Sequence, residues 1–213
     1  MKNFFHTYRL GLLIAAPVAI AMLTVAAGCG SSTDKQAAAA PPAKQEAKKS
    51  LVTFNKDGEL QRPTGYRKWT YVGTPVTPND MNKGKAPFPE FHSVYMNPEA
   101  VNHYEKTGKF PDGTILVKEL VSVGSKEATS GNGYFMGEFI GLEVSIKDKT
   151  RYKDEPGNWA YFSFGHKYPL KDKAKAQPTA SCNECHDGDA GDDWVFTQYY
   201  PVLRAAKGTA KGK

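Results

Sequence analysis

Residues 182–186 read Cys-Asn-Glu-Cys-His, and no other short stretch of the chain constrains its fold as much. A disulfide between Cys182 and Cys185 would close a very small loop and stabilise little, and a zinc site would need further cysteines or histidines at ligand spacing, which do not follow. C-x-x-C-H is the attachment pattern of c-type haem, in which both thiols bond to the haem and the adjacent histidine ligates its iron. We therefore expect one covalently bound haem, held by Cys182 and Cys185, with His186 as axial ligand of the iron.

The ligand in the sixth position on the iron distinguishes an electron-transfer cytochrome from a protein that binds or transforms a small molecule. An electron-transfer cytochrome usually fills this position with methionine or histidine, and neither residue follows His186 in the sequence. Each upstream candidate, taken alone, is more typical of a core or surface residue: these are His92, His103, His166, Met81, Met96 and Met136. We expect an open distal site that binds or transforms a small molecule, with a plain electron carrier as the weakest alternative.

The N-terminal segment has the composition of a processing signal. Residues 1–28 combine basic residues, an apolar run and small residues before Cys29, which predicts a signal peptide rather than a permanent membrane-anchor helix. This context resembles a bacterial lipobox, in which Cys29 is lipidated; ordinary signal cleavage is the alternative. Residues 29–50 lack aromatic and large aliphatic side chains and predict a flexible tether. We expect a haem-binding domain over residues 51–213, located in the periplasm and anchored to a membrane if Cys29 is lipidated.

The net charge of the chain, +6, belongs mostly to its ends. Loss of Lys2 and Arg9 with the leader leaves 26 basic residues against 22 acidic ones. Several of the remaining lysines lie in the tether and in a short basic C-terminal tail: Lys35, Lys44, Lys48, Lys49, Lys207, Lys211 and Lys213. The folded part is therefore close to neutral, and we expect no nucleic-acid partner.

The pattern of apolar residues predicts mostly strands. Alternation and β-branched or aromatic content predict strands over residues 91–96, 114–123, 134–146 and 158–164, with a glycine- and serine-rich turn over 124–133. A helix is expected over 97–108, with Asn97 as N-cap and Gly108 as its end, and another from Pro201. The predicted fold class is mainly β: an antiparallel sheet with a few short helices, packing one c-type haem.

The hairpin over residues 114–146 allows a prediction of strand register. Apolar residues recur on one face of each strand, namely Ile115, Val117, Val121 and Val123 on the first and Ile140, Leu142, Val144 and Ile146 on the second. Directly opposed residues share a face, so odd positions of the first strand should oppose even positions of the second. The other face then holds Leu116, Lys118, Leu120, Phe139, Gly141 and Glu143. A bulge near Gly137 or Gly141 would break this parity.

Periodicity alone leaves two interpretations of Lys118 and Glu143. The first is a solvated face with a cross-strand ion pair, which would contribute less than about 1 kcal/mol. The second is a wall of the haem site, with Gly141 giving the ring close access and a partly buried Lys118 that becomes a nucleophile. The matched faces place Glu143 two residue pairs from the rung of Lys118, about 13 Å away, which is too far for a direct ion pair without a bulge.

Several blocks of the sequence resemble the cytochrome P-460 family: "APFPEFHSVYMNPEAVNHYEKTGKFPDGTILVKELVSV", "SGNGYFMGEFIGLEVSIKD", "EPGNWAYFSF" and the segment from "CNECH" to "VFTQYYPVLRAAK". The resemblance implies a homodimeric, mostly antiparallel β protein with one c-type haem that oxidises hydroxylamine. It also implies that Lys118 cross-links to the haem and that Glu143 is the distal carboxylate. His92, where a relative has arginine, and Phe139 are candidates for the distal pocket.

The resemblance further implies a reaction. Hydroxylamine would bind the iron opposite His186 and be oxidised to nitrogen oxides, with electrons passing to a soluble periplasmic cytochrome. Glu143 would accept protons, its pKa raised by the apolar haem face, while Lys118 would alter the haem through the cross-link. The alternative is a nitric oxide-binding protein without turnover, as in the related β-fold cytochromes c′, which lack the cross-link.

Overall fold

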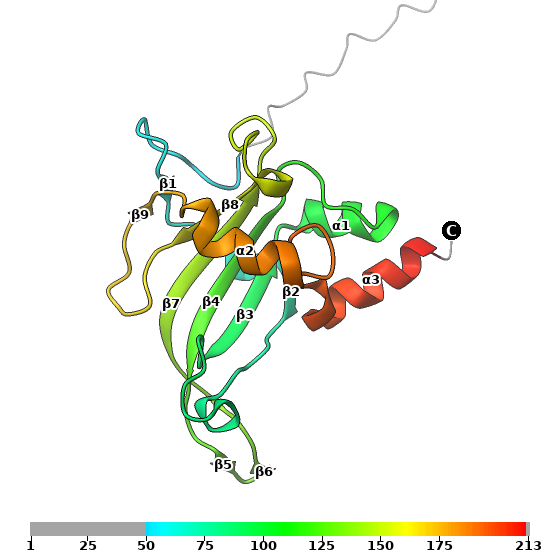
Figure 1. Cartoon of the computed structure of the whole chain (residues 1–213). Coiled ribbons are helices and arrows are strands. Elements are labelled where there is room, and N and C mark those ends of the chain that lie inside the picture. Colours follow the sequence, from blue (N-terminus) through cyan, green and yellow to red (C-terminus); the bar gives the residue numbers. More distant parts are fainter. Residues whose placement is uncertain (1–49, 212–213) are drawn as a thin grey trace, which may run out of the picture. The chain divides into compact units, whose positions relative to one another are not determined.

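The computed structural model describes residues 50–211. The predicted signal peptide, Cys29 and the tether up to residue 49 lie outside these residues. Figure 1 shows a central antiparallel sheet whose strand order is β2-β3-β4-β7-β8. Its strands are β2 (Thr70–Gly73), β3 (Phe91–Met96), β4 (Ile115–Val123), β7 (Met136–Lys147) and β8 (Trp159–Ser163). The four predicted strands are confirmed within two residues at each end.

Short elements complete the described part of the chain. Two small ladders pair β1 (Leu60–Gln61) with β9 (Lys173–Ala174), and β5 (Glu127–Ala128) with β6 (Gly131–Asn132) inside the predicted turn. The helices are α1 (Pro98–Thr107), α2 (Thr179–Asp189) and α3 (Pro201–Lys211), and 3-10 turns occur at η1 (Tyr66–Lys68), η2 (Asn79–Asn82), η3 (Pro156–Asn158) and η4 (Thr197–Tyr199). The predicted fold class, mainly β with a few short helices, is confirmed.

The start of α1 differs in detail from its prediction. Asn97 precedes the helix, but its side chain makes no capping hydrogen bond. Its Oδ1 instead accepts from the backbone N–H of Ile115 at 2.8 Å, and its Nδ2 donates to the carbonyl of Gly113 at 3.3 Å. Gly108 ends the helix with a positive φ of 68°, as its missing Cβ allows. Asn97 therefore fastens α1 to the beginning of β4.

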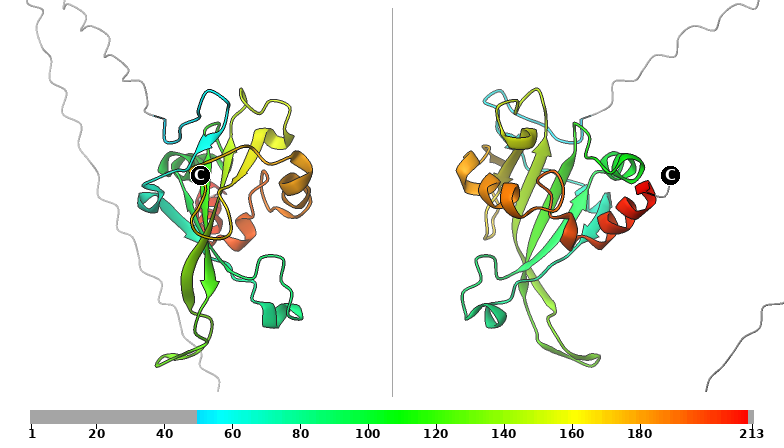
Figure 2. Two further views of the ribbon diagram at one scale, coloured as in Figure 1. Left: turned by 90° about the vertical axis from the view of Figure 1, so that its left-hand side faces the viewer. Right: turned by 45° about the vertical axis from the view of Figure 1, so that its right-hand side comes forward.

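The two faces of the sheet build two separate cores, because side chains alternate along each strand. One core contains Val94, Met96, Leu116 and Tyr161 and packs against all three helices, with Cys182 at its border. The other core contains Ile115, Val117, Val144, Ile146 and Phe162 together with Leu60 and Ala174 from the β1–β9 ladder. In Figures 1 and 2, α2 crosses one face of the sheet over β7, β4 and β3. Within residues 50–211 no helix is long and apolar enough to cross a membrane.

The register between β4 and β7 confirms the predicted parity and corrects the predicted offset. Ile115 pairs with Ile146 and Val117 with Val144, so odd positions oppose even ones. Lys118, however, lies directly opposite Glu143, not two pairs away. Two register shifts near the tip explain the difference, since continuing the pairing of Val123 with Met136 would place Gly141 opposite Lys118. The two extra residues of β7 bring Glu143 there instead.

Candidate functional site

The C-x-x-C-H motif lies on α2, where Cys182 and Cys185 are one helical turn apart. Both cysteines are free: Cys182 is half-buried and Cys185 is exposed. Burial raises the pKa of the Cys182 thiol, and the Glu143 carboxylate adds to the effect. The two thiols are therefore not joined to each other and lie one turn apart on the same helix, as covalent haem attachment requires.

His186 is held in one orientation by its surroundings. Its Nδ1 lies 2.7 Å from the carbonyl oxygen of Trp194, and its ring packs between those of Tyr161 and Phe196, with centroids 4.5 and 4.7 Å away. Burial lowers the pKa of His186, so its neutral form is favoured. A hydrogen bond from Nδ1 to a carbonyl is the usual outer-shell support of a metal-binding histidine, because it leaves Nε2 free for the metal.

The sheet face toward α2 carries the pair that the sequence analysis singled out. Lys118 Nζ lies 2.5 Å from Glu143 Oε2, and both side chains are about three-quarters buried. The Lys118 ammonium also lies 5.4 Å from the centre of the Phe88 ring. The cross-strand ion pair of the first interpretation is therefore present, but on the haem-motif side of the sheet and not on a solvated face.

Glu143 has a second partner, which the sequence analysis did not find. His166 Nε2 lies 3.2 Å from Glu143 Oε1, so each carboxylate oxygen meets a different basic group. Burial acts to raise the pKa of Glu143, but the positive charges of Lys118 and His166 outweigh it, and the net pKa lies below the usual value. The predicted rise in the pKa of Glu143 is thus wrong, because the cross-strand lysine is adjacent.

His92 lies on the same face as Lys118, since it pairs with Leu120 two rungs beyond the Lys118–Val94 pair. The ring is buried, its Nε2 has no hydrogen-bond partner, and the Glu90 carboxylate is 3.9 Å away. Burial, reinforced by the charge of Lys118, lowers the pKa of His92 to about 4. Burial also raises the pKa of Glu90. The structure therefore brings His92 to the site as a neutral side chain.

Phe139 lies on the other side of the sheet. A bulge between Phe139 and Gly141 pairs Phe139 with Val121, and the Arg67 guanidinium stacks 4.5 Å from the Phe139 ring centre. Arg67 binds Glu119, whose side chain points away from Lys118 because the two residues are neighbours on β4. Phe139 is thus not part of the distal pocket. The feature expected to break the predicted parity was a bulge near Gly137 or Gly141, and such a bulge is present.

Gly141 also differs from its prediction. A Cβ at this position would lie 2.7 Å from the carbonyl oxygen of Gly165 and from Leu120 Cδ1, and 3.2 Å from His166 Cα. The space beside Gly141 is therefore filled by the chain after β8 and is not left for a haem edge. The glycine instead lets the segment over residues 164–166 lie against β7.

The unsatisfied polar atoms test whether these residues fit a haem. Among the side chains of residues 50–207, four buried atoms have no hydrogen-bond partner: His92 Nε2, Tyr161 Oη, Asn183 Nδ2 and Trp194 Nε1. Asn183 lies between the two cysteines, Tyr161 packs on His186, and the Trp194 carbonyl holds that histidine. Buried polar groups normally find partners, so their gathering around free thiols and an oriented histidine fits a polar-edged prosthetic group between α2 and the sheet.

The other candidates for a sixth ligand occupy different environments. Met96 is fully buried in the core, whereas Met81 and Met136 are exposed by 73% and 51%. His103 is exposed on α1. Of the candidates named from the sequence, His166 contacts Glu143, and His92 and Met96 lie on the same sheet face as Lys118, each two rungs from the Lys118–Val94 pair.

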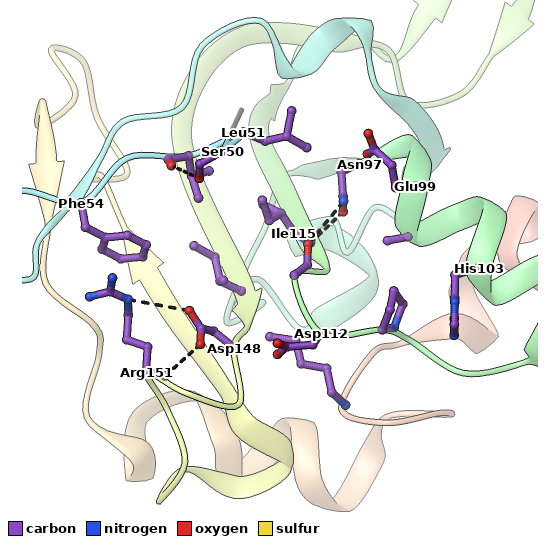
Figure 3. Close-up of a pocket in the computed structure, with 16 residues that line it drawn as sticks. Ser50, Leu51, Phe54, Asn97, Glu99, His103, Asp112, Ile115, Asp148 and Arg151 are labelled. Atoms are coloured by element: carbon purple, nitrogen blue, oxygen red, sulfur yellow. Dashed lines mark hydrogen bonds and ion pairs between the residues drawn. The ribbon is translucent and has the colours of Figure 1, made fainter. Parts of the chain in front are cut away.

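A separate pocket lies where β4 begins and β7 ends (Figure 3). Its volume is about 530 Å³, and it is lined by residues from the start of the described chain, the first turns of α1 and the segment after β7. Around it, Asn97 binds the backbone of Ile115 and Arg151 pairs with Asp148 (Figure 3). The pocket includes no residue of the haem motif, so it is not the candidate site.

Two reduced thiols and an oriented histidine on a helix, packed on an antiparallel sheet, define a β-sheet c-type cytochrome. The family model of cytochrome P460 matches residues 63–197, a range that contains Lys118, Glu143 and the whole haem motif. The chain therefore belongs to the cytochrome P460 family and is a haem-binding c-type cytochrome. No curated protein matches the chain.

Proposed function

We propose that the protein oxidises hydroxylamine to nitrogen oxides at a covalently bound haem. In this proposal Cys182 and Cys185 hold the haem, His186 ligates its iron, and the haem supplies a redox-active metal that binds the substrate nitrogen and accepts its electrons. The observation that carries the proposal is the position of Glu143: a carboxylate on the same sheet face as Lys118, facing the helix of the haem motif.

The chemical role of Glu143 is that of a general base. Hydroxylamine must lose protons as it loses electrons, so a nearby proton acceptor accelerates its oxidation. Because its pKa is lowered, Glu143 is ionised at neutral pH and can accept a proton. The Glu143 side chain is about three-quarters enclosed, since 23% of it is exposed. A small, polar and uncharged substrate such as hydroxylamine fits this setting.

Lys118 has two roles in the proposal. Before the haem cross-link forms, its ammonium must lose a proton to become a nucleophile, and Glu143 Oε2 at 2.5 Å is a suitable acceptor. After the cross-link forms, Lys118 no longer carries the charge that lowers the pKa of Glu143. The pKa of Glu143 would then rise toward the value that burial favours, which makes the carboxylate a stronger base in the working enzyme.

The test of this function is steady-state hydroxylamine oxidation by Glu143→Ala, Glu143→Asp and the wild type. A positioned base typically contributes about 10²- to 10⁴-fold, so Glu143→Ala should lose at least about 10²-fold in kcat while still binding hydroxylamine and nitric oxide. Glu143→Asp should retain part of the activity. Glu138→Ala, an exposed glutamate of the same strand, is the matched control. Unchanged kcat in Glu143→Ala removes this residue from the mechanism.

Haem attachment has its own test. Extraction of the denatured protein with acid and organic solvent should leave the colour on the polypeptide, because the thioether bonds to Cys182 and Cys185 survive. In Cys182→Ser/Cys185→Ser the colour should pass into the solvent or be absent from the start. Haem in the solvent phase of the wild type would contradict covalent attachment.

A second candidate function is nitric oxide binding without turnover. It would use the same haem motif and sheet, and the presence of Lys118 and Glu143 together counts against it. The optical spectrum of the reduced protein separates the two functions: a strongly red-shifted Soret band is expected with the cross-link, and an ordinary c-type spectrum without it. Lys118→Leu should fold and lose the red shift, and a peptide containing Lys118 that runs free of haem would favour the gas binder.

The remaining parts of the proposal concern the setting of the protein. We place it in the periplasm as a homodimer that donates electrons to a soluble cytochrome, with a lipid anchor at Cys29. Membrane fractionation of the wild type and Cys29→Ser tests the anchor, because the variant should leave the membrane fraction. Oxidation kinetics with purified soluble c-type cytochromes as acceptors tests the electron partner.

A further inference from the structure

His166 is positioned next to Glu143 by the way the chain continues after β8. The backbone N–H of Phe164 donates to the carbonyl of Leu142 at 2.9 Å, and that of Leu142 donates to the carbonyl of Gly165 at 3.2 Å. The segment thereby lies against β7, and the missing side chain of Gly141 provides the room. His166, one residue further on, reaches the carboxylate of Glu143, two residues along β7 from Gly141.

The two oxygens of Glu143 have partners of different chemistry. Oε2 meets the Lys118 ammonium at 2.5 Å, and Oε1 meets Nε2 of His166 at 3.2 Å. A lysine ammonium already holds all its protons near neutral pH, whereas an imidazole has a nitrogen that can accept one. Of the two contacts, therefore, only His166 can take a proton from Glu143.

The exposed fractions of these side chains indicate the direction in which a proton would move. Glu143 is 23% exposed and His166 is 50% exposed, so the imidazole lies between the enclosed carboxylate and water. The other nearby histidine, His92, is 14% exposed and is kept neutral by burial and by the charge of Lys118. His92 is enclosed with Glu90, and so it offers no comparable route to solvent.

We propose that His166 is a positioning and proton-relay residue that returns Glu143 to its ionised form by carrying protons to solvent. The proposal rests on the proposed function, because it assigns the path of the protons that Glu143 removes from hydroxylamine. The proton on Glu143 Oε1 moves to His166 Nε2, which gives an imidazolium, and the proton on Nδ1 then leaves to water or buffer. The carboxylate and a neutral imidazole are restored, and no electron moves in these steps.

The charged and titratable groups near the contact between Glu143 and His166 come from three elements. Lys118 on β4 lies on one side, Glu90 and His92 lie on the β3 side, and Cys182 and His186 on α2 feel the same charges. Loss of the Lys118 charge in the cross-link would leave His166 as the nearest basic group of Glu143. The relay therefore gains importance in the cross-linked protein.

The test is the buffer dependence of turnover in the haem-loaded protein. Without the relay, Glu143 must wait for buffer, so His166→Gln should lower kcat at least about tenfold in dilute buffer and recover as the concentration of a buffer that does not ligate iron, such as MES, is raised. The affinity for hydroxylamine and the optical spectrum should not change. His103→Gln, which replaces an exposed histidine on α1, is the control and should behave as the wild type.

A second readout does not depend on activity. Infrared titration follows the protonated carboxyl band of Glu143, which is assigned by its absence in Glu143→Gln. When His166 holds the relayed proton, its charge acts to lower the pKa of Glu143, so that pKa should be higher in His166→Gln. An unchanged pKa, or a kcat of His166→Gln that does not respond to buffer, overturns the relay while leaving hydroxylamine oxidation intact. A wild-type protein that does not oxidise hydroxylamine overturns the proposed function as well.

Discussion

Neighbouring positions of β4 carry two carboxylate–cation pairs that face opposite sides of the sheet. On one side, Glu119 is almost fully buried and receives hydrogen bonds from Tyr66 Oη at 2.6 Å and Arg67 Nε at 2.8 Å. On the other side, Lys118 and His166 contact Glu143, which keeps part of its exposure. The same residue type thus occurs with two very different sets of partners.

The two pairs differ in whether the partners of the carboxylate can exchange a proton near neutral pH. Burial and the contact with Glu119 raise the pKa of the Tyr66 hydroxyl, and the same carboxylate raises the pKa of Arg67. Neither partner of Glu119 therefore exchanges a proton near neutral pH, and the cluster is purely structural. Glu143 instead contacts an imidazole and a lysine, side chains that can gain or lose protons, and it faces the haem motif. Enclosure stabilises a carboxylate pair, whereas titratable partners make it suitable for chemistry.

The largest expected difference is in stability after removal of each carboxylate. Glu119→Ala leaves Tyr66 and Arg67 without their acceptor and should lower the free energy of unfolding by about 3 kcal/mol. Glu143→Ala removes a partly exposed pair and should cost less than about 1 kcal/mol. Urea unfolding of the haem-loaded variants, followed by circular dichroism, measures both values. Equal losses would mean that the two pairs do not differ as their burial suggests.

The next effect is the pH dependence contributed by His92 on the haem-motif face. Its pKa is lowered to about 4 in the folded protein from 6.5, so the unfolded chain binds the proton first as the pH falls. Stability is therefore complete above about pH 6.5 and declines toward pH 4, by about 2 kcal/mol between pH 8 and pH 5. His92→Gln should flatten this decline in urea unfolding curves recorded across the range. A decline of full size in His92→Gln assigns it to other groups.

A smaller effect is expected from Arg67→Lys on the structural face. Lysine keeps the charge but cannot contact Glu119 through two nitrogens, as Arg67 does with Nε and its terminal nitrogen. The loss should be about 1 kcal/mol, the size of one hydrogen bond. Thermal unfolding of Arg67→Lys beside Arg62→Lys, whose arginine pairs with an exposed aspartate, measures it. A Tm as high as that of the control would show that a single charge suffices for Glu119.

The smallest effect is the acid sensitivity due to Glu143. Its pKa lies below the unfolded value of 4.5, so its contribution is present above that value and is lost as the pH falls through the lower folded pKa. The contribution should be under about 1 kcal/mol because the pair is partly exposed. Unfolding of Glu143→Gln between pH 5 and pH 2 should accordingly show a slightly shallower decline than the wild type. A steeper decline would contradict the direction of the shift.

The chemistry-bearing residues were predictable where the signal is local. The spacing of Cys182, Cys185 and His186 indicates haem attachment, since only residues a few positions apart are involved. The parity of β4 and β7 also follows from the sequence, because a strand alternates its faces with a period of two. That parity is enough to place Lys118 and Glu143 on one face, although it says nothing about their distance.

His166 and the true location of Phe139 could not be predicted in the same way. The contact of His166 with Glu143 depends on the pairing of the chain after β8 with β7, which no local pattern specifies. The place of Phe139 depends on a bulge, which the sequence allowed near Gly137 or Gly141 but did not fix at one position. Gly141 indicates that another group lies close to the backbone of β7, but the sequence does not show that this group is the segment containing His166.

The sequence by itself determined the haem motif, the strands and the faces of the central hairpin, because these follow from spacing and periodicity along the chain. The tertiary structure decided the offset between β4 and β7, and with it the ion pair of Lys118 and Glu143. A period of two leaves the offset undetermined by any even number of residues, and only the packing of the bulged hairpin against its neighbours selects one. Whether a carboxylate becomes structural, like Glu119, or chemically available, like Glu143, is decided by the partners that this packing brings to it.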